Sequence, residues 1–570
     1  MVLTFIGHYF VTMNHIRLST RILALALVWL IWTGCGSDDG DSATVFRYNE
    51  SANLSSLDPA QARTLEPMWV IDQIFDGLVE LDADLKIRPL IAESYEVSAT
   101  GLEWTFHLRE DVFFHSDGRV PGLERGRQLV ANDVLYSLNR LRDPLTASSG
   151  AWILENLDEQ AEGQGMTAPD DVTVRFVLKR PFAAFLGLLS TAYANVVPRE
   201  AVEFYGPDFR SHPVGSGPFR LAWWLEDVAC VLHRNDSYWQ QDESGMALPY
   251  LEAVHISFAS DMGTEFQGLL QGRFDFMSGL HPSYMNELLT ESGALREEYA
   301  AELKLETVPF LKTDYIGFYI GEGVADDGAE SAPGIWEPWK DQAVRKALSW
   351  AIDRQQLAIT LRRGTVLPTA HFVPPALLGN TKVSPWLFDR QQARKMLDSV
   401  EVIHPKPWPA LTISTTSDYT DLCAALQYQW QMLGLEVEID VVSASTHRDR
   451  VSSGKAFVFR KSWLADYPDA ENFLALFSTA NFSPAGPNYS HFSNVEFDEV
   501  FAQASGTTDE TSRLALYRQL DQQIAEDLPV IPLFHDQVTH FVRKEVVGWE
   551  VSPINRLDLK RIRKQMSTSR

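Results

Sequence analysis

Two segments in the first third of the chain alternate apolar and polar side chains. Residues 103–109 have the sequence EWTFHLR, and residues 172–178 have the sequence VTVRFVL. A period of two places every second side chain on one face of an extended chain, which is typical of a strand that covers a core on one side. We therefore expect a strand in each segment.

A helical period occurs in two later segments. Residues 341–361 have an apolar face with a spacing of three and four, and the same spacing recurs just before Pro529. The residues that share these faces are Val344, Leu348, Ala351 and Ile352 in the first segment and Tyr517, Leu520 and Ile524 in the second. Each pattern predicts a helix that packs one side against a core.

A strand, a helix and a second strand follow one another in residues 410–442. The sequence ALTIST predicts the first strand, residues 418–433 predict a helix that Gly434 ends, and LEVEIDVV predicts the second strand. A unit of this length is a right-handed crossover between parallel strands. The chain is therefore expected to be α/β with mixed sheets, and clusters of proline and glycine at 213–218, 331–338 and 404–409 indicate connections between units.

The N-terminus has the pattern of an export signal. Arg17 and Arg21 precede an apolar run, ILALALVWLIW, and two small residues and Cys35 follow it. This run is too short for a membrane-spanning helix and matches the apolar region of a signal peptide. Small residues before a cysteine, with the polar segment GSDDGDS after it, resemble a bacterial lipoprotein signal.

We therefore expect a signal peptide over residues 1–34, a lipid on Cys35, and a flexible tether over residues 35–44. The sequence departs from the usual lipoprotein pattern at Trp32, where a leucine is common. A plain secretory signal and an uncleaved N-terminal anchor are the alternatives. Met13 is a second possible start, because a conventional signal begins there.

The composition fits a large folded protein that is not a nucleic-acid binder. Of the 570 residues, 45% are apolar and 22% are charged, as is ordinary for globular chains. The 76 acidic and 49 basic residues give a formal net charge of −27, which repels phosphate backbones. Three cysteines are too few for a disulfide scaffold, and none has the spacing of a zinc pair.

Enzyme motifs are missing from the sequence. We find no GxxxxGK[ST] phosphate loop, no HExxH and no GxSxG. The 14 histidines are scattered, and His535 and His540, which flank DQVT, favour a strand edge over a metal pair. No catalytic residue, cofactor or metal site is therefore expected.

Many segments resemble, in chain order, the peptide-binding branch of the solute-binding proteins that serve ABC importers. They are SLDPA at 56–60, IFDGLVELDADLKIRPLIAESYEVSATGLEWTFHLREDVFFHSDGR at 74–119, ANDVLYSLNRLRDP at 131–144, APDDVTVRFVLKRPFAAFL at 168–186, PVGSGPFRL at 213–221, LHRNDSYW at 232–239, LLQGRFDF at 269–276, AVRKALSWAIDR at 343–354, WLADYPDAENFLALF at 463–477 and SNVEFDEV at 493–500. One such segment is weak evidence, but the common order from about residue 45 to the C-terminus makes the resemblance specific.

The resemblance implies a two-lobed fold of the periplasmic-binding-protein type. Two α/β lobes with mixed sheets are joined by two crossing segments that form a hinge, and an extra domain is inserted into lobe I. On this sequence, lobe I would comprise residues 45–86, 186–311 and 530–570. The inserted domain would comprise residues 87–185, and lobe II residues 312–529.

The implied function is that of the substrate-binding component of an ABC importer, which captures oligopeptides in its cleft and delivers them to a membrane permease. The expected partners are the oligopeptide, the permease subunits and, through Cys35, the membrane. A monomer anchored in the cell envelope is expected. Other branches bind nickel chelates, sugars, haem or opine-like compounds, so a non-peptide solute is one alternative. A secreted hydrolase or a sensor domain is another.

The resemblance also implies binding residues. Asp466, in LADYPD, matches the residue that accepts the α-ammonium of the ligand, and Arg460 lies where relatives have an arginine for the ligand carboxylate. From the sequence alone, the alternatives are that Asp466 lies in a surface turn and that Arg460 is a solvated arginine at a strand end. Trp463 and Tyr467 are expected to be aromatic walls of the site, or else core residues.

Other positions complete the expected site. Arg362 and Arg363 follow the AVRKALSWAIDR helix, where relatives place a further cation for the carboxylate, although a helix C-terminus favours cations in any case. Tyr315 and Phe318 are expected to line the cleft or the hinge. Lobe I is expected to contribute contacts near residues 53–59 and 75–78.

Two further features concern the structure rather than the ligand. Cys230 and Cys423 are expected to be separate buried thiols, because a bridge between the lobes would lock the hinge. The C-terminal sequence LKRIRKQMSTSR carries five basic residues. We expect a solvated terminus there rather than a nucleic-acid site.

Overall fold

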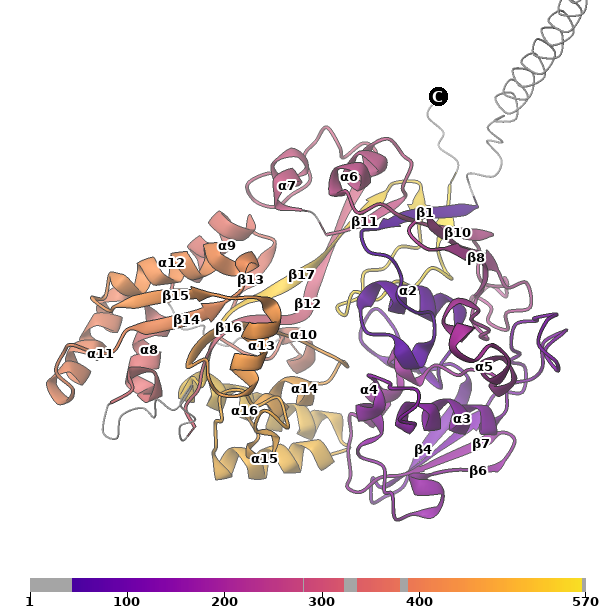
Figure 1. Cartoon of the computed structure of the whole chain (residues 1–570), viewed down its shortest axis with the longest axis horizontal. Coiled ribbons are helices and arrows are strands. Elements are labelled where there is room, and N and C mark those ends of the chain that lie inside the picture. The colour runs from indigo at the N-terminus through magenta and orange to yellow at the C-terminus, as the bar shows by residue number, and fades with distance from the viewer. Residues whose placement is uncertain (1–43, 280, 322–335, 380–387, 566–570) are drawn as a thin grey trace, which may run out of the picture.

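The computed structural model describes residues 44–279, 281–321, 336–379 and 388–565. The expected signal peptide, Cys35 and almost all of the tether lie outside these residues. Within them the chain forms two lobes, with the N-terminal half on the right of Figure 1 and the residues from about 340 to 527 on the left. The C-terminal strand returns between them.

One large mixed sheet extends through both lobes. Its strand order is β15-β14-β16-β12-β17-β11-β1-β10-β9-β8, and β13 pairs with β17. The strands are β1 (Val45–Glu50), β8 (Phe219–Leu225), β9 (Ala229–Arg234), β10 (Ala253–Phe258), β11 (Phe276–Ser278), β12 (Leu303–Phe318), β13 (Val366–Pro368), β14 (Leu411–Thr415), β15 (Val437–Val441), β16 (Val458–Leu464) and β17 (Val530–Arg543). We call the part built on β1 and β8–β11 lobe I, and the part built on β13–β16 lobe II.

The two longest strands connect the lobes. β12 and β17 pair from Leu303–Arg543 to Gly317–Val530, with a register shift between Pro309 and Thr313. On one side of this shift β17 pairs with β11 of lobe I, and on the other side β12 pairs with β16 of lobe II. The two crossing segments that the resemblance implies are therefore these two strands.

Lobe II carries helices on both faces of its part of the sheet. They are α8 (Gln342–Trp350), α9 (Arg354–Arg362), α10 (Pro375–Leu378), α11 (Arg390–Ile403), α12 (Thr420–Gln431), α13 (Ala444–Ser452), α14 (Glu471–Leu474), α15 (Val495–Gly506) and α16 (Glu510–Asp527). Figure 1 shows α9, α11 and α12 beside β14 and β15, and α14–α16 below them. Two separate apolar cores result, one that contains Trp430 and one that contains Phe473.

The helix predicted over residues 341–361 is two helices. Val344, Leu348, Ala351 and Ile352 are all buried, as their spacing predicts. However, α8 ends at Trp350, and the side chain of Asp353 accepts a hydrogen bond from the Gln356 backbone amide, which caps the start of α9. An aspartate inside an apolar period is therefore a helix boundary here.

The predicted crossover unit is present in lobe II. β14 and β15 pair in parallel, α12 connects them, and Gly434 follows the helix with a φ of +75°. A left-handed backbone angle favours glycine, which explains why the helix stops at that point. The helix predicted before Pro529 corresponds to α16, in which Tyr517, Leu520 and Ile524 are buried.

Lobe I has fewer helices, and one of them packs directly against backbone. Its helices are α2 (Leu65–Ile74), α4 (Phe185–Leu189), α5 (Arg199–Tyr205), α6 (Met262–Leu270) and α7 (Pro282–Leu288). Gly215 lies so close to the end of α2 that a Cβ there would be 2.0 Å from the carbonyl oxygen of Ile74. The glycines of the PVGSGPFRL segment therefore allow a strand-entry turn to approach a helix end.

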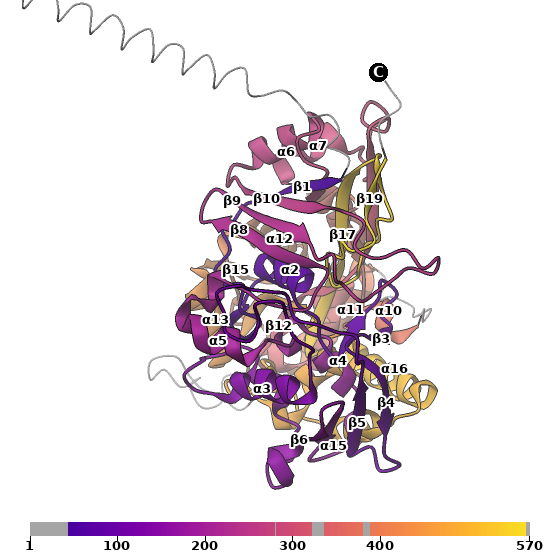
Figure 2. The same ribbon diagram turned by 90° about the vertical axis from the view of Figure 1, so that its right-hand side faces the viewer.

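A smaller antiparallel sheet lies at the end of lobe I away from β1. Its order is β4-β5-β7-β6, and its elements, which we call the small domain, are β4 (Ala92–Val97), β5 (Glu103–Leu108), α3 (Ala131–Arg142), β6 (Met166–Asp170) and β7 (Thr173–Val177). Figures 1 and 2 both show this sheet at the opposite end from β8 and β10. β5 and β7 are the two strands predicted from alternation.

The small domain shares its core with lobe I. Phe106 and Phe176 of the small sheet belong to the same buried cluster as Phe46 of β1 and Ile71 of α2. The inserted segment therefore has its own sheet without a separate core. The residue boundaries of the domains stay predictions.

Shorter elements complete the described chain. They are the strands β2 (Val79–Leu81), β3 (Ile87–Pro89), β18 (Val546–Val547) and β19 (Arg563–Lys564), and the 3-10 turns Pro59–Gln61, Ala151–Leu154, Glu162–Gly165, Ala192–Ala194, Gly206–Ser211, Pro338–Lys340, Ser417–Tyr419, Ala475–Phe477 and Thr479–Asn481.

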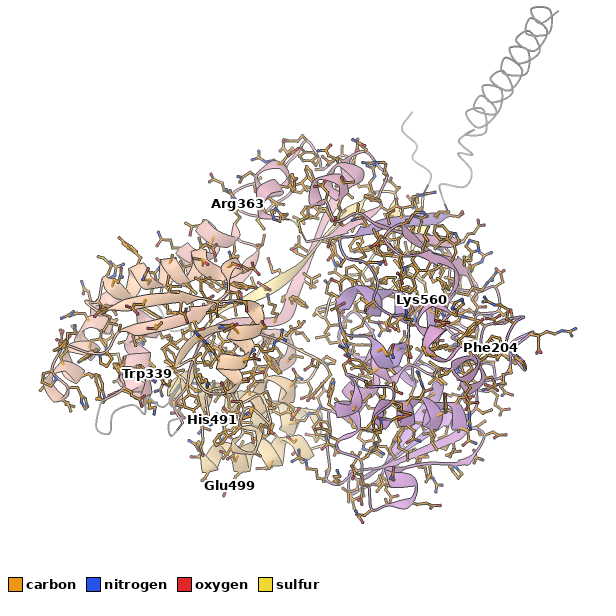
Figure 3. The ribbon with its side chains drawn as sticks, in the orientation of Figure 1. Phe204, Trp339, Arg363, His491, Glu499 and Lys560 are labelled. Atoms are coloured by element: carbon orange, nitrogen blue, oxygen red, sulfur yellow. The ribbon has the colours of Figure 1, made fainter. Side chains whose placement is uncertain are left out.

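Two lysines of the basic C-terminal segment are anchored, contrary to the expected solvated terminus, and residues 566–570 lie outside the described residues. Lys560 is 5% exposed and pairs with Glu80, and Figure 3 shows it within lobe I. Lys564 pairs with Asp275 at 2.9 Å. The carboxylates of Glu80 and Asp275 hold these two lysines in place, and nothing in the local sequence of the tail indicates those distant partners.

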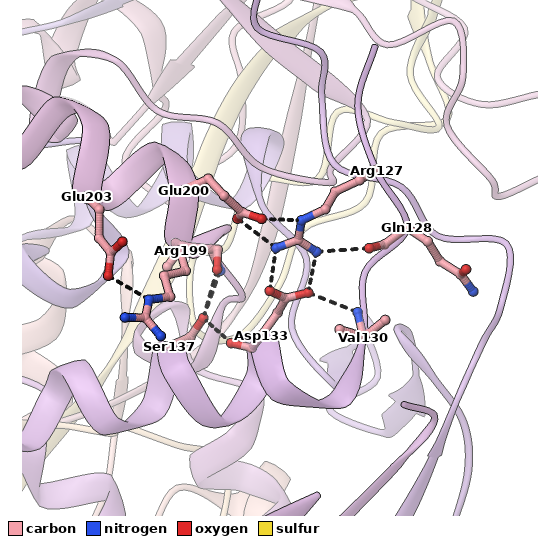
Figure 4. Close-up of polar contacts among 9 residues, drawn as sticks. Arg127, Gln128, Val130, Asp133, Ser137, Arg199, Glu200 and Glu203 are labelled. Carbon is pink, nitrogen blue, oxygen red and sulfur yellow. Dashed lines mark hydrogen bonds and ion pairs between the residues drawn. The ribbon is translucent and has the colours of Figure 1, made fainter. Parts of the chain in front are cut away.

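An arginine ties the small domain to lobe I. Arg127 donates to both Asp133 of α3, at 2.6 Å, and Glu200 of α5, at 2.8 Å (Figure 4). Asp133 in turn accepts a hydrogen bond from the Val130 amide at 2.9 Å, which satisfies the start of α3. One planar guanidinium thus fixes the position of two helices.

The two cysteines in the described chain are free and buried, as expected. Cys230 is in β9 and Cys423 in α12. Burial raises the pKa of Cys230 to about 12, so its thiol stays protonated and unreactive at neutral pH.

Candidate ligand-binding site

Three parallel strands of lobe II end at the same edge of the sheet. β14 is parallel to both β15 and β16, and the three end at Thr415, Val441 and Leu464. In open α/β sheets, ligands bind outside the carboxyl ends of the strands. The turn at 416–419 and the segment after Leu464, which contains Asp466, both lie at this edge.

Lobe I presents an equivalent edge. β1 lies between β10 and β11, and both neighbours are parallel to it. Their carboxyl ends are Glu50, Phe258 and Ser278. The segment after β11 continues to Gly279 and α7, which brings lobe I towards the crossing strands.

A cavity of about 460 Å³ lies beside the crossing strands and is lined by both lobes. We call it the crossing pocket. Its lining includes Gly279 from lobe I, Lys312, Asp314 and Asp536 from β12 and β17, and Arg362 and Tyr419 from lobe II. A space between two lobes beside their connection is the usual place for a ligand in a hinged binding protein.

Three charged groups of the crossing pocket, Lys312, Asp314 and Asp536, are paired with each other. Lys312 contacts Asp536 and lies 3.8 Å from Asp314. Burial by itself would lower the pKa of Lys312, but the charges of Asp314 and Asp536 outweigh it and raise the pKa. Lys312 is therefore fully charged at neutral pH.

Arg460 is occupied by an internal partner. It is 6% exposed, and its guanidinium donates to Asp314 at 2.6 Å and lies 3.0 Å from the ring centroid of Tyr419. Burial would raise the pKa of Asp314, but Arg460 and then Lys312 hold it below its usual range. The structure does not bring Arg460 into contact with Asp466, and its role as a ligand contact stays a prediction that this pairing does not support.

The two adjacent arginines differ in environment. Arg362 lines the crossing pocket and pairs with Asp421 at 3.2 Å. Arg363 ends α9 in a left-handed conformation with a φ of +46°, and its carbonyl oxygen would lie 3.0 Å from a Cβ on Gly293. Figure 3 shows Arg363 at the upper end of lobe II, near α7. Of the two, Arg362 is the one that reaches the pocket.

Asp466 carries a carboxylate without a cationic partner. It is exposed, yet the surrounding protein raises the pKa of its carboxyl, and a hydrogen bond from Asn472 only partly offsets this effect. Asn472 lies 3.5 Å from the carboxylate and accepts a hydrogen bond from the Asp466 amide at 3.4 Å. Among the described residues, Asp466 makes no ion pair. An accessible carboxylate whose surroundings disfavour its ionised form is suited to an ammonium group.

The two aromatic residues of this segment have different surroundings. Trp463 is half-buried, and its indole N–H donates to Asn472 at 2.9 Å. Asn472 therefore orients both Trp463 and Asp466. Tyr467 is 8% exposed and stacks on Trp152 of the small domain, with ring centroids 6.0 Å apart. Trp463 remains placed to line the site, whereas Tyr467 joins lobe II to the small domain.

Several expected contact residues are buried instead. Tyr315 is 1% exposed and meets Phe372 edge-on, and Phe318 is fully buried. In lobe I, Phe75 is 1% exposed, and Asp58 caps a 3-10 turn and pairs with Arg140 at 2.6 Å. These residues support the lobes in this conformation, and ligand contact by them stays a prediction that their burial does not support.

Lys461 is a cation that the expected site does not include. It is half-buried on β16, and its ammonium lies 4.4 Å from the ring centroid of Tyr489. Burial, together with Arg448 and Arg460, lowers the pKa of Lys461 to about 8. Burial raises the pKa of the Tyr489 phenol, and the negative charge of Asp466 raises it further by a smaller amount. Among the described residues Lys461 makes no ion pair, so one cation and one anion near Tyr489 are both open to a ligand.

The family model of the bacterial extracellular solute-binding proteins, family 5, matches residues 86–484. This is well over half of the chain. The chain belongs to this family. As a family 5 solute-binding protein, it is of the extracellular class, which agrees with the export signal predicted for its N-terminus.

Individual relatives match nearly the whole length of this family 5 protein. The glutathione-binding protein GsiB of Salmonella paratyphi A is 27% identical over 512 residues, which cover 88% of this chain and 91% of that protein. The unliganded open form of MppA, a periplasmic murein tripeptide binding protein, has a TM-score of 0.74 and 25% identity, and covers 92% of this chain and 97% of that one. HbpA2 of Haemophilus parasuis has a TM-score of 0.78 at 22% identity, over 92% of this chain and 100% of that one, which shows a shared fold.

The structure contains neither a metal centre nor a membrane span in its described part. No group of three histidine, cysteine, aspartate or glutamate side chains there could hold a metal ion. His535 and His540 are apart, with Thr313 and Asn555 as their respective partners. Among residues 44–565, apart from the undescribed gaps, no helix has the length and apolar content needed to cross a bilayer.

Sequence reasoning missed Asn472 and Lys461. Asn472 lies on α14, six residues after Asp466, and its role depends on a turn that folds back on β16. Lys461 follows Arg460 directly, and nothing in the sequence RKSW separates the paired cation from the unpaired one. Strand alternation places the two side chains on opposite faces of the sheet, which explains their different partners.

Proposed function

We propose that this family 5 protein is the substrate-binding component of an ABC importer and captures short oligopeptides between its lobes. It would then deliver them to a membrane permease as a monomer, without catalysing a reaction. The relatives support a peptide ligand, since GsiB is named for glutathione and MppA for a murein tripeptide. The observation that carries the proposal is the unpaired carboxylate of Asp466 at the carboxyl edge of lobe II.

The chemistry of a free peptide fits this carboxylate. A peptide at neutral pH has an ammonium at one end, a carboxylate at the other, and amides between them. Asp466 would pair with the ammonium, and Asn472 keeps it in place. Trp463 would cover the first residue of the peptide. Beyond Phe459, where its pairing with β14 ends, β16 can bind the amides through its backbone, which is independent of side-chain identity.

Cations for the other end of the peptide are available at two positions. Lys461, which makes no ion pair in the described chain, lies beside Tyr489. Arg362 lines the crossing pocket and would exchange its pair with the half-exposed Asp421 for the ligand carboxylate. Arg460 would act indirectly, because it holds Asp314 and Tyr419 in place. Peptides of different length would place their carboxylate at different cations, so the site would accept ligands of several lengths.

Binding is expected to stabilise the protein and to bring the lobes together. A ligand present at 100 times its Kd adds about 2.7 kcal/mol to the free energy of unfolding, which raises Tm by several degrees. Since the ligand contacts both lobes, it should also favour a closed form. Differential scanning fluorimetry and small-angle X-ray scattering of the purified protein, with a mixed oligopeptide pool, measure the two effects.

A rise in Tm together with a smaller radius of gyration supports the proposal. The matched control is the same pool after N-acetylation, which removes the ammonium and should give a much smaller rise. If no peptide raises Tm at millimolar concentration while a sugar, haem or a nickel chelate does, the ligand class is different and the peptide proposal is wrong.

We also propose that Cys35 carries the lipid that anchors the protein. A Cys35→Ser variant, expressed in its bacterial host, is expected to lose the anchor because serine cannot form the thioether to diacylglycerol. Fractionation should move the protein from the membrane pellet to the soluble fraction. A neighbouring Ser37→Ala variant serves as the control and should stay in the pellet. Because an uncleaved signal could keep the variant in the membrane, the mass of the wild-type N-terminal peptide decides the question, and an unmodified Cys35 in the wild type contradicts the lipid anchor.

A further inference from the structure

Three carboxyl groups interact electrostatically at the carboxyl edge of lobe I. Glu50 is the last residue of β1, Glu66 lies in the first turn of α2, and Glu265 lies in the first turn of α6. Glu66 and Glu265 are the two side chains whose charges act on Glu50. We call this group the acidic corner. Its position at the end of a strand between two parallel neighbours is where ligands bind in such sheets.

Glu50 is buried without any partner for one of its oxygens. The residue is 7% exposed, and among the described residues its Oε1 has no hydrogen-bond partner. Burial first, and then the negative charges of Glu66 and Glu265, raise the pKa of Glu50 to about 8. Burial also raises the pKa of Glu265 to about 7. In the described chain none of the three makes an ion pair.

Ordinary structural reasons explain only part of this arrangement. Acidic residues are common in the first turn of a helix, where they interact with its dipole, and this accounts for Glu66 and Glu265. It does not account for Glu50, which ends a strand. A buried carboxyl oxygen without a partner costs stability, and a cationic group from outside that pairs with it would offset this cost. A metal ion does not fit, because no described group of three acidic side chains could hold one.

We propose that the acidic corner is a second subsite, which receives the cationic side chain of a basic residue in the ligand. The ammonium of a lysine-like side chain or a guanidinium can pair with the unpartnered oxygen of Glu50, and Glu66 and Glu265 add negative charge around it. The inference rests on the proposed function and narrows its substrate class to peptides that carry a basic residue. Asp466 on lobe II and the acidic corner on lobe I would then contact the same ligand. A ligand with a basic side chain would therefore favour the closed form of the protein more than a ligand without one.

The test compares lysine with norleucine, which has a chain of similar length without the ammonium. The probes are Lys-Ala-Ala, Ala-Lys-Ala and Ala-Ala-Lys, their norleucine counterparts, and trialanine, each titrated by calorimetry into the purified protein. At least one lysine peptide is expected to bind about tenfold tighter than its norleucine counterpart. In a Glu50→Gln variant this preference should fall to about twofold or less, with the affinity for trialanine unchanged.

Two further variants distinguish the loss of a ligand contact from general damage to the fold. Asp275→Asn changes another buried carboxyl of lobe I, 4% exposed, at the opposite edge of the same sheet, and should keep the full preference for lysine. Glu265→Gln should lower the preference by a smaller factor than Glu50→Gln, and replaces it as the test if Glu50→Gln does not fold.

The possible outcomes are distinct. If trialanine binds but no lysine peptide is preferred, or if the preference survives in Glu50→Gln, the acidic corner is not a ligand subsite and the peptide function stands. If no peptide binds, trialanine included, the proposed function fails and this inference fails with it.

Discussion

Replacing Asp466 with alanine is expected to weaken the binding of trialanine by about 30-fold to 3,000-fold. Truncating one partner of a desolvated charge pair costs about 2–5 kcal/mol, and each 1.4 kcal/mol is a factor of ten in Kd. The effect is large because the protein around Asp466 already disfavours its ionised form, which a ligand ammonium would restore. Isothermal titration calorimetry of both proteins measures the change.

The ligand itself supplies the decisive control. N-acetyl-trialanine has no ammonium, so it should bind weakly and equally to the wild type and to Asp466→Ala. Asp469→Ala removes a nearby carboxylate that faces Arg513 at 3.9 Å, and should change the affinity for trialanine by less than about threefold. Equal affinities of the wild type and Asp466→Ala for the free peptide would falsify the assignment of Asp466.

Breaking the pair between Arg460 and Asp314 is expected to lower the free energy of unfolding by about 3–5 kcal/mol. Both side chains are less than a tenth exposed, so Asp314→Asn leaves the charge of Arg460 buried next to a neutral group. Denaturant unfolding followed by circular dichroism at neutral pH measures the loss. The double variant Asp314→Leu/Arg460→Met, which removes both charges, should regain most of it.

The pH dependence of this effect has a definite sign. The folded protein holds the pKa of Asp314 below the ordinary value of 3.8, so the stabilisation is complete above that value. It is lost as the pH falls below it, because protonation then removes the charge that Arg460 needs. The difference in the free energy of unfolding between the wild type and Asp314→Asn should therefore shrink on acidification.

The control for this prediction is Glu203→Gln, which breaks an exposed pair with Arg199 and should lower the free energy of unfolding by less than about 1 kcal/mol. A similarly small loss in Asp314→Asn contradicts the prediction.

The pair between Arg460 and Asp314 is a feature of the site that the sequence does not predict. The motif around LADYPD places Arg460 and Asp466 on one segment, and both were expected to contact the ligand. Arg460 instead meets a residue 146 positions earlier in the chain. The register of β12 against β16, with Asp314 opposite Ser462, creates this contact, and no local pattern specifies that register.

The fold was more predictable than the site because its determinants are local. β5, β7, α12, β14, β15 and α16 follow from periods of two or 3.6 residues and from Gly434 and Pro529. The error over residues 341–361 has a local cause as well, since Asp353 begins a new helix inside a continuous apolar period. The anchored tail was missed because its lysines pair with Glu80 and Asp275, which are hundreds of residues away.

By itself, the sequence determined the α/β class and the resemblance to a family that the comparisons confirm, and it predicts an export signal with Cys35 that lies outside the described residues. Those properties depend on residue type and spacing along the chain. Only the tertiary structure decided which charges have partners: Arg460 is paired with Asp314, whereas Asp466, Lys461 and Glu50 have no ion pair in the described chain. The reason is that an ion pair depends on distance and burial in space, and the crossing strands and the two sheet edges set both.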